Sequence, residues 1–230
     1  MAKKEAVKEI FNDIAPKYDL LNHFLSLNID KRWRRKAIEY IRPEEKGELL
    51  DVACGTGDFS IEAYRAGVRK VTGIDISANM VAIGQKKVEQ LGLASCITLQ
   101  AGDSEQIGFE DEHFDVVTVA FGVRNFEHLE AGLKEMLRVL KKGGKVIILE
   151  FSMPEHFPMK QVYKFYFRRI LPILGGWISG NKDAYTYLPE SVMKFPQGEV
   201  FLDILKGCGF VQATQRKLTF GIASIYVGVK

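Results

Sequence analysis

Three aspartates occupy corresponding places in the first half of the chain. Asp51, Asp75 and Asp103 each lie in or at the end of a short apolar run, and Ser104 follows the last of them. A carboxylate can accept hydrogen bonds from both hydroxyl groups of a ribose, and a further polar side chain suits the amino group of adenine. The pattern predicts that these four residues bind a cofactor that contains a nucleoside.

A glycine-rich turn, Gly55-Thr56-Gly57, follows the first of these runs. Glycine lets the backbone pass close to a ligand where a Cβ atom would clash, so the turn is a second candidate for cofactor binding. Ser60 replaces the third glycine of a dinucleotide fingerprint, and the carboxylate of Asp58 would repel a phosphate. The turn therefore favours S-adenosylmethionine, which carries positive charge and no phosphate, over NAD. An NAD-dependent oxidoreductase is the weaker alternative.

Arg124 and Asn125 follow a further apolar run, Phe114–Ala120. Burying the charge of an arginine at the carboxyl end of a strand costs free energy unless the charge has a partner. We therefore interpret the pair as functional rather than as a simple entry into the next helix.

Alternating strand and helix patterns must position these side chains. Strands are predicted at Glu48–Ala53, Lys70–Ile74, Ile97–Gln100, Phe114–Ala120 and Lys145–Phe151, and helices around Ser60–Ala66, Asn79–Leu91 and Glu127–Leu140. This alternation indicates βαβ units and a parallel sheet covered on both faces. Gly143-Gly144 is expected to end the last of these helices. Gly209–Arg216 and Ala223–Val229 are too close in sequence for a crossover helix and should pair antiparallel. The expected fold is α/β, with a doubly wound, Rossmann-like sheet.

One domain is predicted to span residues 1–230, with a cofactor-binding core at 47–153. Residues 1–46 read as an N-terminal helical cover, and 198–230 hold a terminal helix and strands. Residues 154–197 form an insertion that faces substrate or membrane. Its basic residues alternate with large aromatic ones, so it could pack inward, lie on a membrane surface or cover a hydrophobic substrate. These basic residues are Lys160, Lys164, Arg168 and Arg169.

Composition excludes several other classes of function. Lys and Arg total 32 against 29 Asp and Glu, a net charge of +3 over 230 residues, which gives no electrostatic sign of nucleic-acid binding. Cys54, Cys96 and Cys208 are too far apart for a thiolate zinc site, and the four histidines lack metal-ligand spacing, so we expect no metal. No signal peptide or spanning apolar run is visible, so we expect a cytoplasmic protein that contacts any membrane from one side.

The glycine turn, the acids at the strand ends and the antiparallel ending together resemble a class I S-adenosylmethionine-dependent methyltransferase. The resemblance implies a seven-stranded sheet. Amine and base methyltransferases usually carry Asn/Asp-Pro-Pro-Tyr/Phe after the fourth strand, and this chain has Phe121-Gly-Val-Arg-Asn125 there. A nucleobase acceptor is therefore disfavoured.

Longer motifs are similar to the C-methyltransferases of ubiquinone and menaquinone biosynthesis. They are Tyr18–Ser26, Phe121–Asn125, Arg138–Ser152 and Tyr185–Ser191, and the resemblance runs from about Val7 to Val229. It implies methylation of a ring carbon of a polyprenylated quinol, such as conversion of 2-demethylmenaquinol to menaquinol. A polyprenyl benzoquinol acceptor and a non-catalytic cofactor-binding paralogue are the alternatives, and the oligomeric state is left open.

The same resemblance implies roles for individual residues. Arg124 would stabilise the oxyanion that develops on the quinol, and Asn125 would position the ring oxygen. The candidate quinol-pocket residues are Tyr18, Tyr185 and Tyr187. Asp30 stands where the family usually has histidine, so a catalytic role for that histidine does not carry over. A prenylated substrate also favours peripheral membrane association of Phe157–Trp177 on the inner face of the cell membrane.

Overall fold

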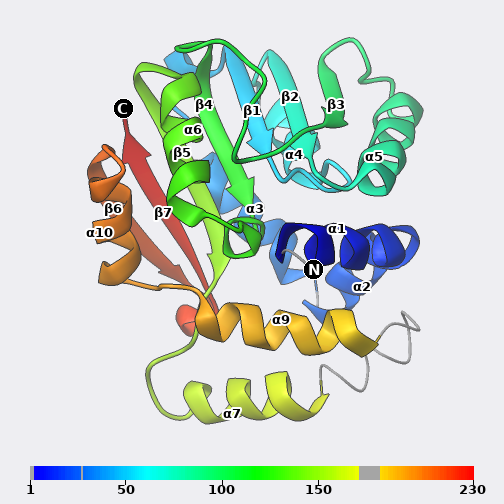
Figure 1. Ribbon diagram of the computed structural model, residues 1–230, viewed down its shortest axis with the longest axis vertical. Helices are drawn as coiled ribbons and strands as arrows, with labels where there is room; N and C mark the ends of the chain where they lie inside the picture. Colours follow the sequence, from blue (N-terminus) through cyan, green and yellow to red (C-terminus); the bar gives the residue numbers. More distant parts are fainter. Residues whose placement is uncertain (1–2, 27, 171–181) are drawn as a thin grey trace.

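A seven-stranded sheet forms the centre of the computed structural model, which describes residues 3–26, 28–170 and 182–230. The strand order is β3-β2-β1-β4-β5-β7-β6; β7 is antiparallel to both neighbours and the other pairs are parallel. The strands are β1 (Glu48–Val52), β2 (Lys70–Asp75), β3 (Ile97–Ala101), β4 (Phe114–Ala120), β5 (Leu140–Phe151), β6 (Val211–Leu218) and β7 (Ala223–Val229). The expected doubly wound sheet with an antiparallel C-terminal strand is confirmed (Figure 1).

Helices cover both faces of this sheet, which is why its central strands are apolar on both sides. The α-helices are α1 (Lys3–Ile14), α2 (Tyr18–Leu25), α3 (Ile29–Ile38), α4 (Asp58–Arg65), α5 (Ala78–Gln90), α6 (Leu129–Val139), α7 (Met159–Phe165), α9 (Lys182–Lys194) and α10 (Glu199–Gly207). Shorter turns are η1 (Ala15–Lys17), η2 (Pro43–Glu45), η3 (Val123–Asn125), η4 (Tyr166–Ile170) and η5 (Thr219–Gly221). One buried cluster joins α3, α4 and α5 to the sheet, and a second joins α6 and α10 to it.

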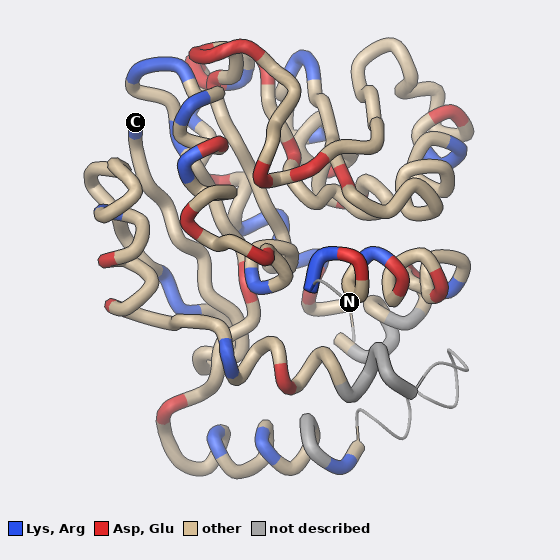
Figure 2. Tube along the Cα trace, viewed as in Figure 1, with Lys and Arg blue, Asp and Glu red and all other residues tan. Residues whose placement is uncertain are grey.

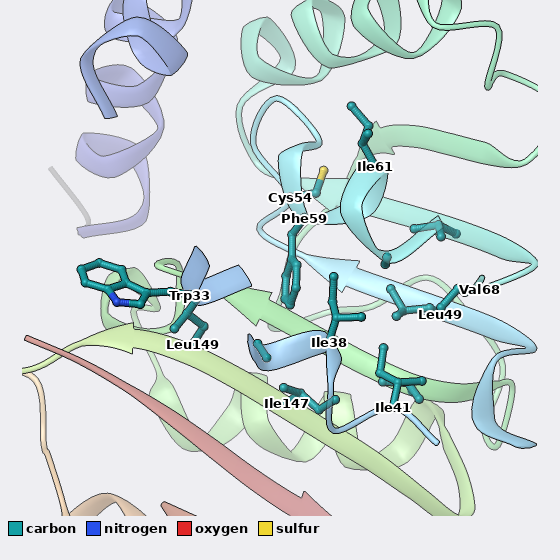
Figure 3. Packing of buried hydrophobic residues seen from close by; sticks show 14 of the residues in the cluster. Trp33, Ile38, Ile41, Leu49, Cys54, Phe59, Ile61, Val68, Ile147 and Leu149 are labelled. Carbon is teal, nitrogen blue, oxygen red and sulfur yellow. The ribbon is translucent and has the colours of Figure 1, made fainter. Parts of the chain in front are cut away.

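Packing against β5 fixes the position of α3. Trp33 and Ile38 are buried in the same cluster as Ile147 and Leu149 of β5 and Phe59 of α4 (Figure 3). Trp33 also contacts the ring of Phe151, with the ring centroids 6.1 Å apart. A helix that precedes the core in sequence is thereby held rigidly beside the glycine turn.

A separate layer of helices lies at the carboxyl ends of the parallel strands. In Figure 1, α1, α2, α9 and α7 lie below this end of the sheet. A third buried cluster, with Ile14, Met80, Tyr163 and Val192 as members, joins α1, α5, α7 and α9. The N-terminal segment and the 154–197 segment therefore meet over the edge where open α/β sheets bind ligands.

The start of β5 differs from the expectation for Gly143-Gly144. The helix α6 already ends at Val139, and β5 begins at Leu140, so both glycines lie inside the strand. The β4–β5 register shifts near this point, and Gly143 has φ +75°, which glycine adopts without steric cost. The glycines accommodate an irregularity in the strand and do not end the helix.

None of the helices within residues 3–26, 28–170 and 182–230 is both long and apolar enough to cross a membrane. The end of the Phe157–Trp177 segment, from residue 171 onward, lies outside the described residues.

Candidate functional site

The glycine turn is held by the acid at the end of β2. The Gly55 N–H donates to Asp75 Oδ2 at 2.8 Å, and the Ser77 N–H donates to Asp75 Oδ1 at 2.8 Å. Asp75 is 9% exposed, and burial raises the pKa of its carboxyl group. Gly55 has φ +56° and Gly57 has φ +81°, and a Cβ on Gly57 would lie 2.8 Å from Leu99 Cδ1. Glycine is therefore required at both positions of the turn.

Asp51 lies deeper, beneath the turn. It is 1% exposed and accepts hydrogen bonds from the hydroxyls of Ser60, at 2.6 Å, and Thr118, at 3.0 Å. Burial raises the pKa of its carboxyl group to about 6, while the two hydroxyl donors oppose the rise. Ser60, which takes the place of a third glycine, thus orients a carboxylate.

A cleft of about 680 Å³, including its open mouth, lies in front of the turn. Asp75, Asp103, Ser104 and Asn125 line it together with Gly55. Residues of α1 form its outer wall, and one of them, Lys4, pairs with Asp103 at 2.8 Å (Figure 2 shows the alternating charges along α1). The structure therefore gathers the acids of β2 and β3 in one cleft beneath the N-terminal cover.

A second cavity of about 620 Å³ adjoins this cleft. Its lining combines aromatic rings with a few polar groups, and the residues that matter most for its chemistry are Tyr18, Phe121, Arg124, Phe151 and Tyr187. The rings of Phe121 and Phe151 are stacked with centroids 4.4 Å apart, and the Arg124 guanidinium lies 5.6 Å from the Phe151 centroid. Such a cavity suits a flat aromatic ligand with polar substituents.

Glu150 is the partner that Arg124 requires. Arg124 Nη1 lies 2.8 Å from Glu150 Oε1, and the backbone N–H of Arg124 donates to Glu150 Oε2 at 3.3 Å. Ser191 accepts from Arg124 Nε at 3.2 Å. The Glu150 side chain is fully buried, and burial raises the pKa of its carboxyl group although the arginine opposes the rise. The pair holds a charged guanidinium against the wall of the second cavity.

Tyr18 lies where the two cavities meet. It lines both of them, as does Phe121, whereas Asn125 lines the first and Arg124 the second. The hydroxyl of Tyr187 donates to Asn125 Oδ1 at 3.1 Å, which links the 154–197 segment to η3. Two ligands could thus approach each other beside Tyr18.

Comparison with known proteins identifies the family. The family model described as the ubiE/COQ5 methyltransferase family matches residues 1–230.

The chain belongs to the ubiE/COQ5 methyltransferase family.

Two relatives illustrate the match. A demethylmenaquinone methyltransferase of Bacteroides fragilis is 46% identical over 229 residues, covering 99% of this chain and 94% of the relative. A ubiquinone/menaquinone biosynthesis C-methyltransferase, UbiE, of Geobacter sulfurreducens is 48% identical over 230 residues, covering 99% and 90%.

Solved structures share the fold at lower identity. An S-adenosylmethionine-dependent methyltransferase of Thermotoga maritima, described as a possible histamine N-methyltransferase, superposes with a TM-score of 0.68 at 19% identity and covers 96% of this chain and 99% of its own. Phosphoethanolamine N-methyltransferase 2 of Haemonchus contortus, in complex with S-adenosyl-L-methionine, gives 0.65 at 16% identity, covering 86% and 52%. The expected class I methyltransferase fold is confirmed.

The chain is therefore an S-adenosylmethionine-dependent methyltransferase, and the cofactor expected from the sequence is confirmed. The residues present fit that group. The cleft holds Asp75, which is buried, and Asp103, which is half-buried, for the ribose and adenine, and Gly55 lines it without a Cβ. When bound, the cofactor supplies an electrophilic methyl group.

The sequence-derived site residues fall into three groups in this methyltransferase. Asp75, Asp103, Ser104, Gly55 and Asn125 lie together in the first cleft, while Tyr18, Arg124 and Tyr187 line the second cavity. Asp51 and Thr56 line a smaller recess behind the turn, and Gly57 opens α4. The side chain of Tyr185 lies outside the described residues.

Sequence reasoning missed an ionic cluster between α2, α3 and the glycine turn. His23 Nδ1 lies 3.0 Å from Asp30 Oδ2, and His23 Nε2 lies 3.4 Å from Asp58 Oδ2. Arg34 Nη1 pairs with Asp30, and Arg34 Nη2 lies 3.8 Å from Asp58. Burial works against ionisation of Asp30, but Ser26, Arg34 and His23 together hold the pKa of its carboxyl group below the usual value.

This cluster changes the interpretation of Asp30. Asp30 stands where the sequence resemblance implies a histidine, and the ring of His23 lies directly beside it. His23, Asp30 and Asp58 together have the ligand types of a metal site, but the guanidinium of Arg34 already supplies positive charge between the two carboxylates. The i, i+4 spacing of Asp30 and Arg34 was the signal available in the sequence. No local pattern indicated His23 or Glu150.

Proposed function

We propose that this methyltransferase converts 2-demethylmenaquinol to menaquinol by methylating a ring carbon. The observation that carries the proposal is the aromatic cavity that contains Arg124 and opens beside Tyr18 onto the cofactor cleft. The relatives are named for demethylmenaquinone methylation or for both quinone pathways, which favours the naphthoquinol over a benzoquinol acceptor. We further propose that residues 1–230 act as one catalytic unit, with 1–46 covering the donor and 154–197 covering the acceptor.

Deprotonation of the quinol is the chemical requirement of this reaction. A phenolic hydroxyl has a pKa of about 10, and the ring carbon becomes a good nucleophile only as that proton leaves. Arg124 stays protonated and stabilises the developing oxyanion from the cavity wall, where Glu150 holds its guanidinium in place. Asn125, fixed by Tyr187, positions the ring oxygen. Burial raises the pKa of Tyr18, so its hydroxyl remains protonated and can donate at the junction.

A methyl-transfer assay tests the acceptor. The purified protein is incubated with methyl-deuterated S-adenosylmethionine and a short-chain demethylmenaquinol or the corresponding demethyl benzoquinol, and the products are analysed by mass spectrometry. We expect label in menaquinol, and stronger label there than in the benzoquinol product. Tight binding of S-adenosylhomocysteine with no label in either quinol would reject the proposal and favour a non-catalytic paralogue.

We also propose that α7 carries the enzyme to the membrane face where a prenylated quinol resides. Phe157, Val162 and Phe165 are 81%, 56% and 62% exposed, and Lys160 and Lys164 lie on the same segment (Figure 2). Exposed aromatic residues beside lysines are typical of helices that lie in a membrane interface. The protein would then act in the cytoplasm, on the inner face of the cell membrane.

Flotation with liposomes tests this second proposal. We expect binding to anionic vesicles that weakens with salt, and loss of binding in a Phe157→Ser/Phe165→Ser variant. Val211→Ser is the matched control, because Val211 is also an exposed apolar residue, with 53% of it exposed. It lies on β6 beside Val229, at the opposite end of the sheet from α7. Absence of flotation at low salt, or equal loss in both variants, would contradict the proposal.

A further inference from the structure

A groove beside α9 belongs neither to the cofactor cleft nor to the second cavity. It has a volume of about 930 Å³, including its open mouth, and lies between the second half of α9, η3 and the start of α6. We call it the α9 groove. Its walls include buried or half-buried apolar residues, which are Val123, Phe126, Leu129, Phe195 and Pro196.

The α9 groove adjoins both the cofactor cleft and the second cavity. Phe126 and Glu127 line the groove and the cleft, and Arg124 and Tyr187 line the groove and the second cavity. The hydrogen bond from Tyr187 to Asn125, which lines the cleft, lies where the three meet. A chain attached to an acceptor ring near the donor can therefore pass directly into the groove.

The polar side chains of the groove already have partners within the protein. Lys3 Nζ donates to two backbone carbonyls, at 2.6 and 3.3 Å. Lys194 pairs with Glu190 at 3.5 Å, and both side chains are more than half exposed, so these charges lie at the rim. Inside, Ser191 accepts from Arg124 Nε at 3.2 Å. A polar ligand would have to replace these partners, whereas an apolar chain leaves them in place.

The proposed acceptor carries an apolar chain at a suitable position. In 2-demethylmenaquinol the polyprenyl chain is bonded to the ring carbon next to the one that receives the methyl group. When the receiving carbon faces the donor beside Tyr18, the chain leaves the ring close to the cofactor cleft. Each isoprene unit is apolar, so its burial against apolar walls is favourable.

We propose that the α9 groove binds the first isoprene units of the polyprenyl tail. This inference rests on the proposed function, and it adds a site for the tail to the site for the ring. The ring stays in the second cavity, and the tail passes Tyr187 and lies against Phe126, Leu129 and Phe195. Tail and ring then both determine the affinity for the acceptor.

Binding measurements with two quinones test this site. Calorimetry in the presence of S-adenosylhomocysteine compares a methyl naphthoquinone that has no tail with its geranyl derivative. We expect the geranyl derivative to bind at least about 10-fold more tightly, because its tail is buried in the groove. Equal affinity would overturn the tail site. Methyl transfer to a quinol in the assay described above would then leave the proposed function standing, whereas absence of transfer would reject that function separately.

Two variants of α6 show whether the groove provides this affinity. Leu129→Asn places an amide on the apolar wall and should reduce the preference for the geranyl derivative by about 10-fold. Leu137→Asn is the matched control, because Leu137 is a half-buried residue of the same helix that packs against the same cluster and lies outside the groove. An equal loss of preference in both variants, or equal weakening of both quinones by Leu129→Asn, would contradict the proposal.

Photo-crosslinking of the wild type locates the tail without a variant. A geranyl quinone with a diazirine at the end of its tail is irradiated in the complex, and the crosslinked peptides are identified by mass spectrometry. We expect crosslinks within residues 123–129 and 187–196. Crosslinks confined to α2 or α7 would place the tail elsewhere and overturn the proposal.

Discussion

A buried ion pair, Arg124 with Glu150, gives the second cavity its charged group. Arg124 and Glu150 form a pair in which neither charge is exposed to solvent, with 6% and 0% of the side chains exposed. Removing one partner of a buried ion pair leaves the other charge unpaired, and this loss exceeds the net value of the pair itself. Any variant of Arg124 therefore changes both stability and chemistry, and the two effects need separate readouts.

Arg124→Met is expected to lower kcat by about 100-fold or more, because a donor to the developing oxyanion is lost. It should also cost about 3–5 kcal/mol of unfolding free energy, because the Glu150 carboxylate stays buried and unpaired. Glu150→Gln in the same chain should restore most of the stability without restoring kcat. Steady-state kinetics, urea unfolding and S-adenosylhomocysteine binding provide the readouts. Recovery of kcat in the double variant would show that Arg124 acts only through folding.

Asp51 should make stability depend on pH. Its carboxyl pKa is raised to about 6 in the folded protein, from an ordinary value near 3.8, by burial. The folded state therefore holds a proton that the unfolded state has lost between about pH 4 and pH 6, so unfolding free energy contributed by this group falls as pH rises through that range. Asp51→Asn removes the effect and keeps the size of the side chain. The stability difference between wild type and variant, from urea unfolding, should change steadily from pH 4 to 6; a constant difference would contradict this.

At the scale of elements, the donor cleft is closed by a helix outside the Rossmann core. α1 is joined to the core by Lys4, which lies 2.8 Å from Asp103 and 3.3 Å from Glu105, and by Asn12, which accepts from Ser77 at 2.7 Å. These polar contacts are partly exposed and stabilise the start of the helix only slightly, whereas Ile14 at its end is buried in the cluster shared with α5. Weak attachment of the first turn suits an element that must open before the donor can enter and leave.

Lys4→Met is expected to raise the dissociation rate of S-adenosylhomocysteine several-fold, because α1 loses its link to Asp103. It should change unfolding free energy by less than about 1 kcal/mol, since the pair is partly exposed. Lys8→Met, which removes the same charge from the same helix, is the control. Stopped-flow dissociation checks the expectation, and equal rates for both variants and the wild type would contradict it.

Most of the elements that form the cleft could be predicted from sequence, because they depend on local patterns. The apolar run before Asp75 and the glycines of the turn are contiguous, and periodicity alone places them at strand ends. Glu150 could not be predicted as the partner of Arg124, because the two meet only through the pairing of β4 with β5. His23 and Asp58 meet across two elements that are far apart in sequence. Gly143-Gly144 was misinterpreted because a strand irregularity and a helix end both use glycine with positive φ.

For the whole molecule, our proposal assigns the donor and the acceptor to different parts of one chain. The core provides the strand-end acids, the N-terminal cover provides Tyr18, and the 154–197 segment provides Tyr187. A ligand stabilises the states that bind it. Donor binding should therefore slow backbone hydrogen exchange in the N-terminal cover as well as in the core.

Hydrogen exchange measured by mass spectrometry checks this. At 100 times its dissociation constant, S-adenosylhomocysteine should raise unfolding free energy by about 2.7 kcal/mol and slow exchange in α1 and α2. β6 lies at the far edge of the sheet and should change little by comparison, which makes it an internal control. Slower exchange confined to the glycine turn would show that the cover does not respond to the donor.

The position of the 154–197 segment has a consequence for how the family can diversify. The chain leaves the sheet after β5 and returns through α10 to the edge strand β6, so this segment lies between two elements that already pack on the sheet. A change in its length or sequence reshapes the acceptor cavity without altering the order of the strands or the glycine turn. We therefore expect that acceptor preference can be exchanged between relatives by transplanting this segment, and that such a chimera shows the quinone selectivity of its source.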